Sequence, residues 1–122
     1  MRDIALFVKD MLAAILAIEQ FVEGMTVEEL RQDDKTSSAV IRKFEIVGEA
    51  AKHVPQNLRE TYSRVPWKEM AGMRDRLIHA YFGIDYTLVW EAITTELPKI
   101  QPVLEQMLYE MNNTPHSGED VQ

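Results

Sequence analysis

The sequence predicts an all-α fold, and three observations support this class. In three long segments, apolar residues recur at steps of three and four, which is the period of one face of a helix. No segment shows the alternation of apolar and polar residues that marks a half-buried strand. Gly24, Pro55 and Gly83 lie between the segments, where such residues end helices. We therefore expect a bundle of four main helices with one or two short extra helices.

The first helix is expected over residues 2–24, with Gly24 as its C-terminal stop. Its apolar stripe is wide, which is typical of a helix that packs against more than one neighbour. Thr26 and Glu29 then match a capping box, which predicts a short helix over residues 26–32. The main positions of the stripe are Ile4, Val8, Met11, Ile15, Ile18 and Val22.

The second long helix is expected from Asp34 or Thr36 to Val54, and Pro55 ends it. Gly48 lies in the middle of this helix, where a glycine costs about 1 kcal/mol relative to alanine if the position is exposed. A close approach of another helix would offset that cost. We therefore expect a neighbouring backbone to lie against Gly48.

The third long helix is expected from Trp67 to about Phe82. Residues 55–66 come before it and should be short and irregular, with one or two helical turns. Pro66 can serve as the first residue of the helix, where its missing N–H costs nothing. Gly83 should break the helix.

The last helix is expected from about Tyr86 to Glu110, with Asp85 as its N-cap. Pro98 and Pro102 should kink it or briefly interrupt it. We expect one helical domain over residues 1–111, and we expect residues 112–122 to form a polar, disordered tail.

Charge limits the classes of function. The 122 residues fit one domain, and their formal net charge is −7. This charge argues against a protein that coats nucleic acids, because phosphate binding needs surplus lysine and arginine. Five of the thirteen basic residues lie between Arg59 and Arg76, so a local basic cleft is compatible with the acidic total.

Composition also limits the compartment and the cofactors. The chain has no cysteine, which excludes disulfides and thiolate metal sites, and it shows neither a signal peptide nor an apolar run long enough for a bilayer. We therefore expect a cytoplasmic protein without a membrane segment. His53, His79 and His116 lack the paired spacing of metal ligands, and the scattered glycines form no phosphate loop. No metal or cofactor is expected.

The segment AGMRDRLIHAYFGIDY, residues 71–86, holds the candidate site. One interpretation is structural, with solvated arginines and half-buried His79 and Tyr81. The other is RNA cleavage without a metal. His79 would exchange a proton with a ribose 2′-OH or a leaving oxygen, and Arg74 would bind the phosphate and its transition-state charge. Asp75 would fix the imidazole tautomer, and Tyr81 would donate a hydrogen bond or stack on a base.

The spacing of Arg74 and His79 raises a geometric difficulty. Residues five apart on an ideal helix point about 140° away from one another. Either the arginine side chain wraps round the helix, or the helix is distorted, or two chains build the site together. A two-chain site would supply one histidine as base and another as acid, which favours a homodimer.

The sequence resembles the HepT-type toxins of the HEPN superfamily. Residues 74–81, RDRLIHAY, fit the pattern R-x4-H-x-Y, and Asp75 fills the polar position that follows the arginine. The segments FEIVGEAAKHVP (44–55), VPW (65–67) and YFGIDYTLVWEAITTELP (81–98) also resemble this family. The likeness covers roughly residues 2–108.

The resemblance implies a HEPN four-helix bundle and a homodimer whose motif helices face each other across a cleft. It implies a toxin that cleaves RNA without a metal, with Arg74 and His79 as catalytic residues and Asp75 in support. It also implies an MNT-type nucleotidyltransferase antitoxin that attaches AMP to Tyr81, which would block phosphate entry. Arg76 would add positive charge that helps to hold RNA.

Two other functions stay open at this point. The first is a non-catalytic HEPN module that assists a nucleotidyltransferase by binding nucleotide or substrate. The second is a plain structural dimer, which needs nothing at Tyr81. Glu49, in the segment VGEA, is expected to have a structural or supporting role and no catalytic one.

Overall fold

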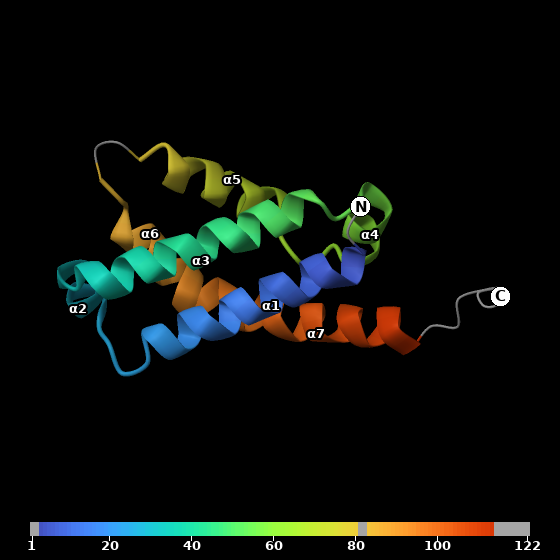
Figure 1. Ribbon diagram of the computed structural model, residues 1–122, viewed down its shortest axis with the longest axis horizontal. Helices are drawn as coiled ribbons and strands as arrows, with labels where there is room; N and C mark the ends of the chain where they lie inside the picture. Colours follow the sequence, from blue (N-terminus) through green and yellow to red (C-terminus); the bar gives the residue numbers. More distant parts are fainter. Residues whose placement is uncertain (1–2, 81–82, 114–122) are drawn as a thin grey trace.

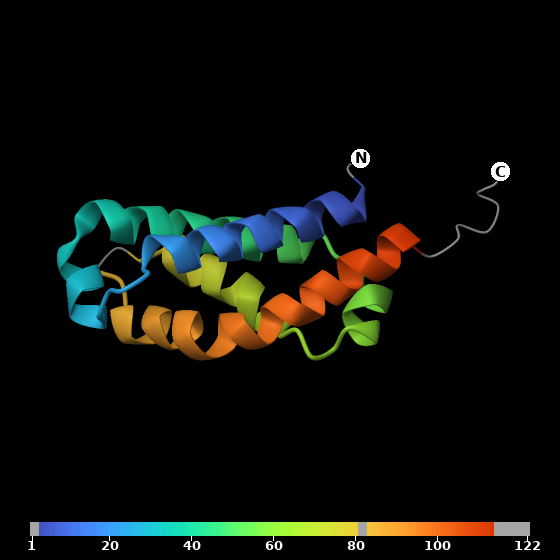
Figure 2. The same ribbon diagram turned by 90° about the horizontal axis from the view of Figure 1, so that it is seen from below.

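All regular structure is helical in the computed structural model, which describes residues 3–80 and 83–113. In Figures 1 and 2, α3 lies between α1 and α5, and α7 packs against α1. The predicted all-α bundle with short extra helices is confirmed. The elements are α1 (Ile4–Phe21), α2 (Val27–Gln32), α3 (Asp34–Lys52), α4 (Gln56–Thr61), α5 (Trp67–Ile78), α6 (Tyr86–Glu91), η1 (Ala92–Glu96) and α7 (Leu97–Asn113).

Side chains at the helix N-termini explain where several helices begin. The carboxylate of Asp3 accepts a hydrogen bond from the N–H of Ala5 at 3.1 Å and so caps α1. The reciprocal capping box of Thr26 and Glu29 starts α2 as predicted. Asp85 caps α6, also as predicted. These polar contacts satisfy backbone N–H groups that have no partner within the helix.

The ends of α1 and α3 come slightly earlier than the sequence predicted. α1 ends at Phe21, and Gly24 adopts a φ of 78°, which lets the chain turn into α2. α3 ends at Lys52, where the guanidinium of Arg59 donates hydrogen bonds to the carbonyl oxygens of Ala51 and Val54, each at 2.8 Å. Arg59 is thus a C-terminal cap of α3.

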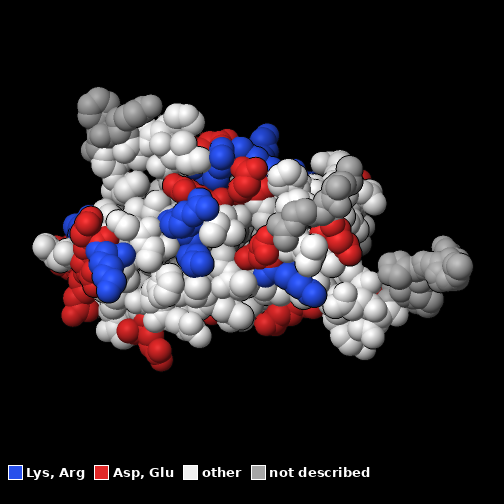
Figure 3. Space-filling view, in the orientation of Figure 1, with Lys and Arg blue, Asp and Glu red and all other residues white. Residues whose placement is uncertain are grey.

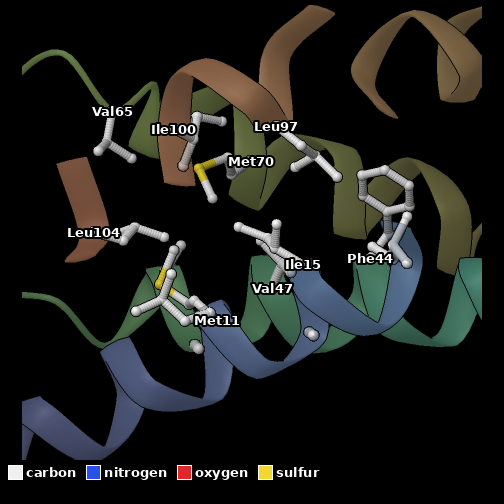
Figure 4. Close-up of a cluster of buried hydrophobic side chains, with 14 of the residues drawn as sticks. Met11, Ile15, Phe44, Val47, Val65, Met70, Leu97, Ile100 and Leu104 are labelled. Carbon is white, nitrogen blue, oxygen red and sulfur yellow. The ribbon is translucent and has the colours of Figure 1, made fainter. Parts of the chain in front are cut away.

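The main core lies where α1, α3, α5 and α7 meet (Figure 4). Burial of these apolar side chains is the main favourable term that holds the bundle together. The side chains that the helices contribute to this cluster are apolar. The polar residues of α5 therefore lie on other faces of that helix. The side chains labelled in Figure 4 are Met11, Ile15, Phe44, Val47, Val65, Met70, Leu97, Ile100 and Leu104.

The last helix is interrupted near its first proline, as predicted. In η1 the hydrogen bonding shifts to the π pattern, and the N–H of Leu97 donates to the carbonyl of Ala92, five residues earlier. Pro98, which has no N–H, follows directly, and Pro102 lies inside α7. α7 continues to Asn113, so the first two residues of the expected 112–122 tail are helical. Residues 114–122 lie outside the described residues.

The prediction that the third long helix reaches Phe82 is wrong. α5 ends at Ile78, and His79 is its C-cap with φ −101° and ψ 19°. Both the backbone N–H and the ring Nδ1 of His79 contact the carbonyl oxygen of Asp75, at 3.2 and 2.8 Å. The histidine side chain thus caps the last turn of the helix. Among the described helices, none is long and apolar enough to cross a membrane.

Candidate active site

The site is built on a very close contact between α3 and α5 at Gly48. A Cβ atom at this position would lie 2.3 Å from the Cβ of Arg74 and 2.7 Å from the carbonyl oxygen of Met70. Such distances leave no room for any side chain, so the predicted close approach at Gly48 is confirmed. The neighbouring helix is α5, and the contact falls on Arg74 itself. Packing against α3 therefore fixes the backbone of Arg74.

Two carboxylates hold the guanidinium of Arg74. Its Nη2 lies 3.3 Å from Oε1 of Glu49, and its Nη1 lies 3.1 Å from Oδ1 of Asp75. The Arg74 side chain is 28% exposed, so it is accessible from solvent but anchored along its length. Glu49 belongs to α3 and follows Gly48 directly, so the same close contact brings its carboxylate to the arginine. The supporting role expected for Glu49 agrees with this geometry.

Asp75, which is on α5, also forms an ion pair with Lys52 on α3. Its Oδ1 also accepts a hydrogen bond from Nζ of Lys52 at 2.9 Å. Hydrogen bonds from Lys52 and then Arg74 hold the pKa of the Asp75 carboxyl below its ordinary value. The carboxylate therefore stays ionised at neutral pH. Sequence analysis missed Lys52, although its position three residues after Glu49 places both on one face of the helix.

The imidazole of His79 is oriented by a backbone atom. Its Nδ1 lies 2.8 Å from the carbonyl oxygen of Asp75. Because a carbonyl oxygen can only accept, Nδ1 must carry the hydrogen, and Nε2 of the neutral ring is then a proton acceptor. Asp75 thus fixes the imidazole tautomer as expected, but it does so through its backbone carbonyl oxygen and not through its carboxylate. That carboxylate is turned toward Lys52 and Arg74.

The structure does not bring all the predicted residues together. Within the described part of the chain, no hydrogen bond joins Arg74 to His79. Arg76 points to another side of α5, where its Nη2 lies 3.7 Å from the sulfur of Met73 and its side chain lines an apolar groove against α6, η1 and α7. Tyr81 lies outside the described residues.

A hollow of about 190 Å³ opens beside Arg74, between α1, α3 and the end of α5. On the face seen in Figure 3, acidic and basic side chains are interspersed and form no continuous basic surface.

His53 and Phe7 line the hollow beside Arg74, and sequence analysis did not assign either to a site. The lining residues are Phe7, Asp10, Arg42, Glu45, Ile46, Glu49, Ala50, His53, Arg74 and Ile78.

Among the residues that the structure describes, no group of three or more histidine, aspartate or glutamate side chains is arranged to hold a metal ion. His79 can transfer a proton, and Arg74 can bind an anion.

Comparison with known proteins identifies the family. Residues 11–107 match the family HepT-like, described as "Ribonuclease HepT-like". The chain is 43% identical over 110 residues to "Putative RNase MJ0125" of Methanocaldococcus jannaschii, a match that covers 90% of this chain and 95% of the relative. It is 40% identical over 101 residues to "Probable ribonuclease HepT" of Thermococcus cleftensis, with coverage of 83% and 92%.

A third relative, "Putative RNase TTE0752" of Caldanaerobacter subterraneus, is 45% identical over 87 residues, which are 71% of this chain and 78% of that protein. No solved structure matches the chain. The chain therefore belongs to the HepT-like ribonuclease family of the HEPN superfamily.

Proposed function

We propose that this protein is the toxin of a toxin–antitoxin pair and acts as a metal-independent endoribonuclease. The single observation that carries the proposal is the state of His79, whose Nδ1 is bound to the carbonyl of Asp75 and whose Nε2 is thereby left as a base. Membership of the HepT-like ribonuclease family and the names of the relatives support the same activity.

In the proposed reaction, the 2′-oxygen of a ribose attacks the adjacent phosphorus and gives up its proton to Nε2 of His79. The bond from phosphorus to the 5′-oxygen breaks, and that oxygen takes a proton from an acid. The products are a 2′,3′-cyclic phosphate and a free 5′-hydroxyl. Arg74 stabilises the charge that builds on the phosphate oxygens, for which it releases Glu49 or Asp75.

The acid in this scheme is His79 of the partner subunit in a homodimer. Arg74 and His79 share no hydrogen bond within one chain, and one imidazole cannot be base and acid in the same step. Ile78, which lies next to His79, is 42% exposed and offers apolar surface beside the site for a protomer contact. The two motif helices would then face each other across a common cleft.

The regulation that we propose acts at Tyr81. An MNT-type nucleotidyltransferase antitoxin would transfer AMP to its hydroxyl, two residues after His79 in the chain. The adenylate would place a negative charge and a bulky group beside the catalytic histidine, and it would exclude the substrate phosphate. Mass spectrometry of the protein after co-expression with such an enzyme should show added AMP on Tyr81, and a Tyr81→Phe variant should escape both the modification and the inhibition.

The activity is tested by incubating the purified, unmodified protein with RNA in EDTA. We expect cleavage, fragments that end in a 2′,3′-cyclic phosphate, and no cleavage by His79→Ala. Intact RNA across a broad set of single-stranded and structured substrates would reject the ribonuclease and favour the non-catalytic binding module.

A further inference from the structure

The hollow beside Arg74 contains a stacked pair of rings. The rings of His53 and Phe7 have centroids 4.5 Å apart and planes inclined by 6°. One face of the His53 imidazole is therefore covered by Phe7. The His53 side chain is nevertheless 50% exposed, which leaves ring surface away from Phe7 accessible to a ligand. An aromatic ring that is backed by another ring and open on one side is a platform on which a planar group can stack.

Contacts on α3 and α1 hold this platform in a defined position. Nε2 of His53 lies 3.4 Å from Oε2 of Glu49, whose other oxygen faces Arg74 at 3.3 Å. The same carboxylate thus lies between the His53 ring and the proposed phosphate anchor. A nucleotide whose phosphate is bound at Arg74 would have its base within reach of His53, because both residues line one hollow.

The size of the hollow suits one base and not a larger ligand. Its volume of about 190 Å³ is below the roughly 300–1,000 Å³ of pockets that enclose drug-sized molecules. Its walls include apolar groups of Ile46 and Ala50, against which a flat ring can pack.

The charges around the hollow also favour a neutral base. Both guanidiniums that line the hollow already face carboxylates, because Arg42 lies 3.5 Å from Glu45 and Arg74 lies 3.3 Å from Glu49. A second phosphate inside the hollow would be repelled, whereas carboxylate oxygens can accept hydrogen bonds from the amino groups of a base.

We propose that this hollow binds one base of single-stranded RNA, which stacks on the open face of His53 while its phosphate lies at Arg74. The proposal deepens the proposed function and rests on it for the role of Arg74. His53 is then a binding residue that places the scissile phosphate, and it takes no proton from the substrate. Stacking on a ring tolerates any base, so the hollow contributes affinity more than sequence preference.

The test uses an RNA oligonucleotide that cannot be cleaved, with every ribose 2′-O-methylated and one base replaced by fluorescent 2-aminopurine. Stacking quenches this fluorophore, so a titration with the full-length protein reports both binding and stacking. The variants are His53→Ala and His53→Phe, of which the second keeps a ring but no nitrogen. Tyr109→Ala is the matched control, because Tyr109 is an aromatic residue on α7 that is 68% exposed and lies outside the hollow.

We expect His53→Ala to weaken binding by about 5- to 150-fold and to abolish the quenching, since base–aromatic stacking contributes roughly 1–3 kcal/mol per base. His53→Phe should restore both signals, and Tyr109→Ala should leave both unchanged. In cleavage assays with unmodified RNA, His53→Ala should raise KM and leave kcat nearly the same. An unchanged affinity in His53→Ala, or a failure of His53→Phe to restore it while circular dichroism shows a folded protein, would overturn the proposal.

The two proposals fail separately. If the quenching depends on His53 but the protein cuts no RNA, the base-binding proposal stands and the ribonuclease proposal is rejected. If the wild-type protein cleaves RNA and His53→Ala has the same Kd and KM, the ribonuclease proposal stands and the base-binding proposal is rejected. A fall in kcat that His53→Phe does not rescue would make His53 a proton-transfer residue and would also reject the stacking platform.

Discussion

Arg74 lies within α5 and His79 lies just after its end, and the two residues are held in different ways. Arg74 lies where α3 and α5 pack closest, and its guanidinium is fixed by carboxylates from both helices. His79 follows the last helical residue, and a contact to the carbonyl of Asp75 orients its ring. In the proposed mechanism, the site thus combines a phosphate anchor held by packing with a proton-transfer group that remains accessible. Variants of the two residues should therefore separate activity from stability.

The largest effect is expected from His79→Ala. Loss of the general base should reduce RNA cleavage by about 10²- to 10⁴-fold. The free energy of unfolding should change by less than about 1 kcal/mol, because His79 is exposed. His79→Asn is the control, since asparagine can keep a helix cap but cannot transfer the proton. Cleavage by the asparagine variant at the wild-type rate would remove His79 from the mechanism.

Arg74→Ala should lower activity and stability together. Cleavage should fall by about 10²- to 10³-fold through loss of transition-state stabilisation. The urea midpoint should also fall, because Glu49 and Asp75 lose the cation between them. Arg74→Lys keeps the charge but not the planar fork of donors, so it should recover stability better than kcat. Equal recovery of both properties would mean that Arg74 acts only through its charge.

Gly48→Ala tests the packing that fixes Arg74. Its added Cβ would meet the Cβ of Arg74 at 2.3 Å, so α3 and α5 must separate, and we expect a loss of about 1–3 kcal/mol in the free energy of unfolding. Gly72→Ala is the matched control on α5. Its Cβ would meet only the guanidinium of Arg76 at 4.0 Å, so this change should stabilise the helix by roughly 0.5–1 kcal/mol. Urea unfolding of both variants measures the contrast, and two effects of the same sign would contradict it.

The smallest effect concerns the pH dependence of Asp75. Hydrogen bonds from Lys52 and Arg74 lower its pKa in the folded state. A lowered pKa means that the carboxylate stabilises the fold above the pKa of the unfolded chain, near 3.9, and that this contribution is lost as the pH falls through the folded value. The stability difference between the wild type and Asp75→Asn should thus be present at pH 7 and shrink below about pH 4. A difference that stays constant from pH 7 to pH 2 would show that the ion pairs do not stabilise the protein.

The sequence predicts what depends on local spacing. The apolar periodicity identifies the long helices, the pair Thr26 and Glu29 identifies the start of α2, and Gly48 identifies the close helix contact. The motif also singles out Arg74 and His79. Each of these follows from a rule that acts within a few residues along the chain.

The contacts that complete the site depend on tertiary structure and were missed for that reason. Lys52 reaches Asp75 across 23 positions of sequence, and the pairing of His53 with Phe7 joins α3 to α1. The sequence placed the end of α5 too late, because apolar periodicity does not reveal that the His79 side chain hydrogen-bonds to the carbonyl oxygen of Asp75 in the last turn of the helix. Helical patterns identify the faces that pack but not which helix packs against which.

The central claim is that one active site needs His79 from two chains, and subunit mixing tests it most directly. Wild-type protein is mixed with an equal amount of His79→Ala, the subunits are exchanged, and RNA cleavage is measured in EDTA. If both histidines serve one site, only dimers of two wild-type chains are active, and activity falls to about one quarter. Activity of about one half would show that each chain carries a complete site and would contradict the account.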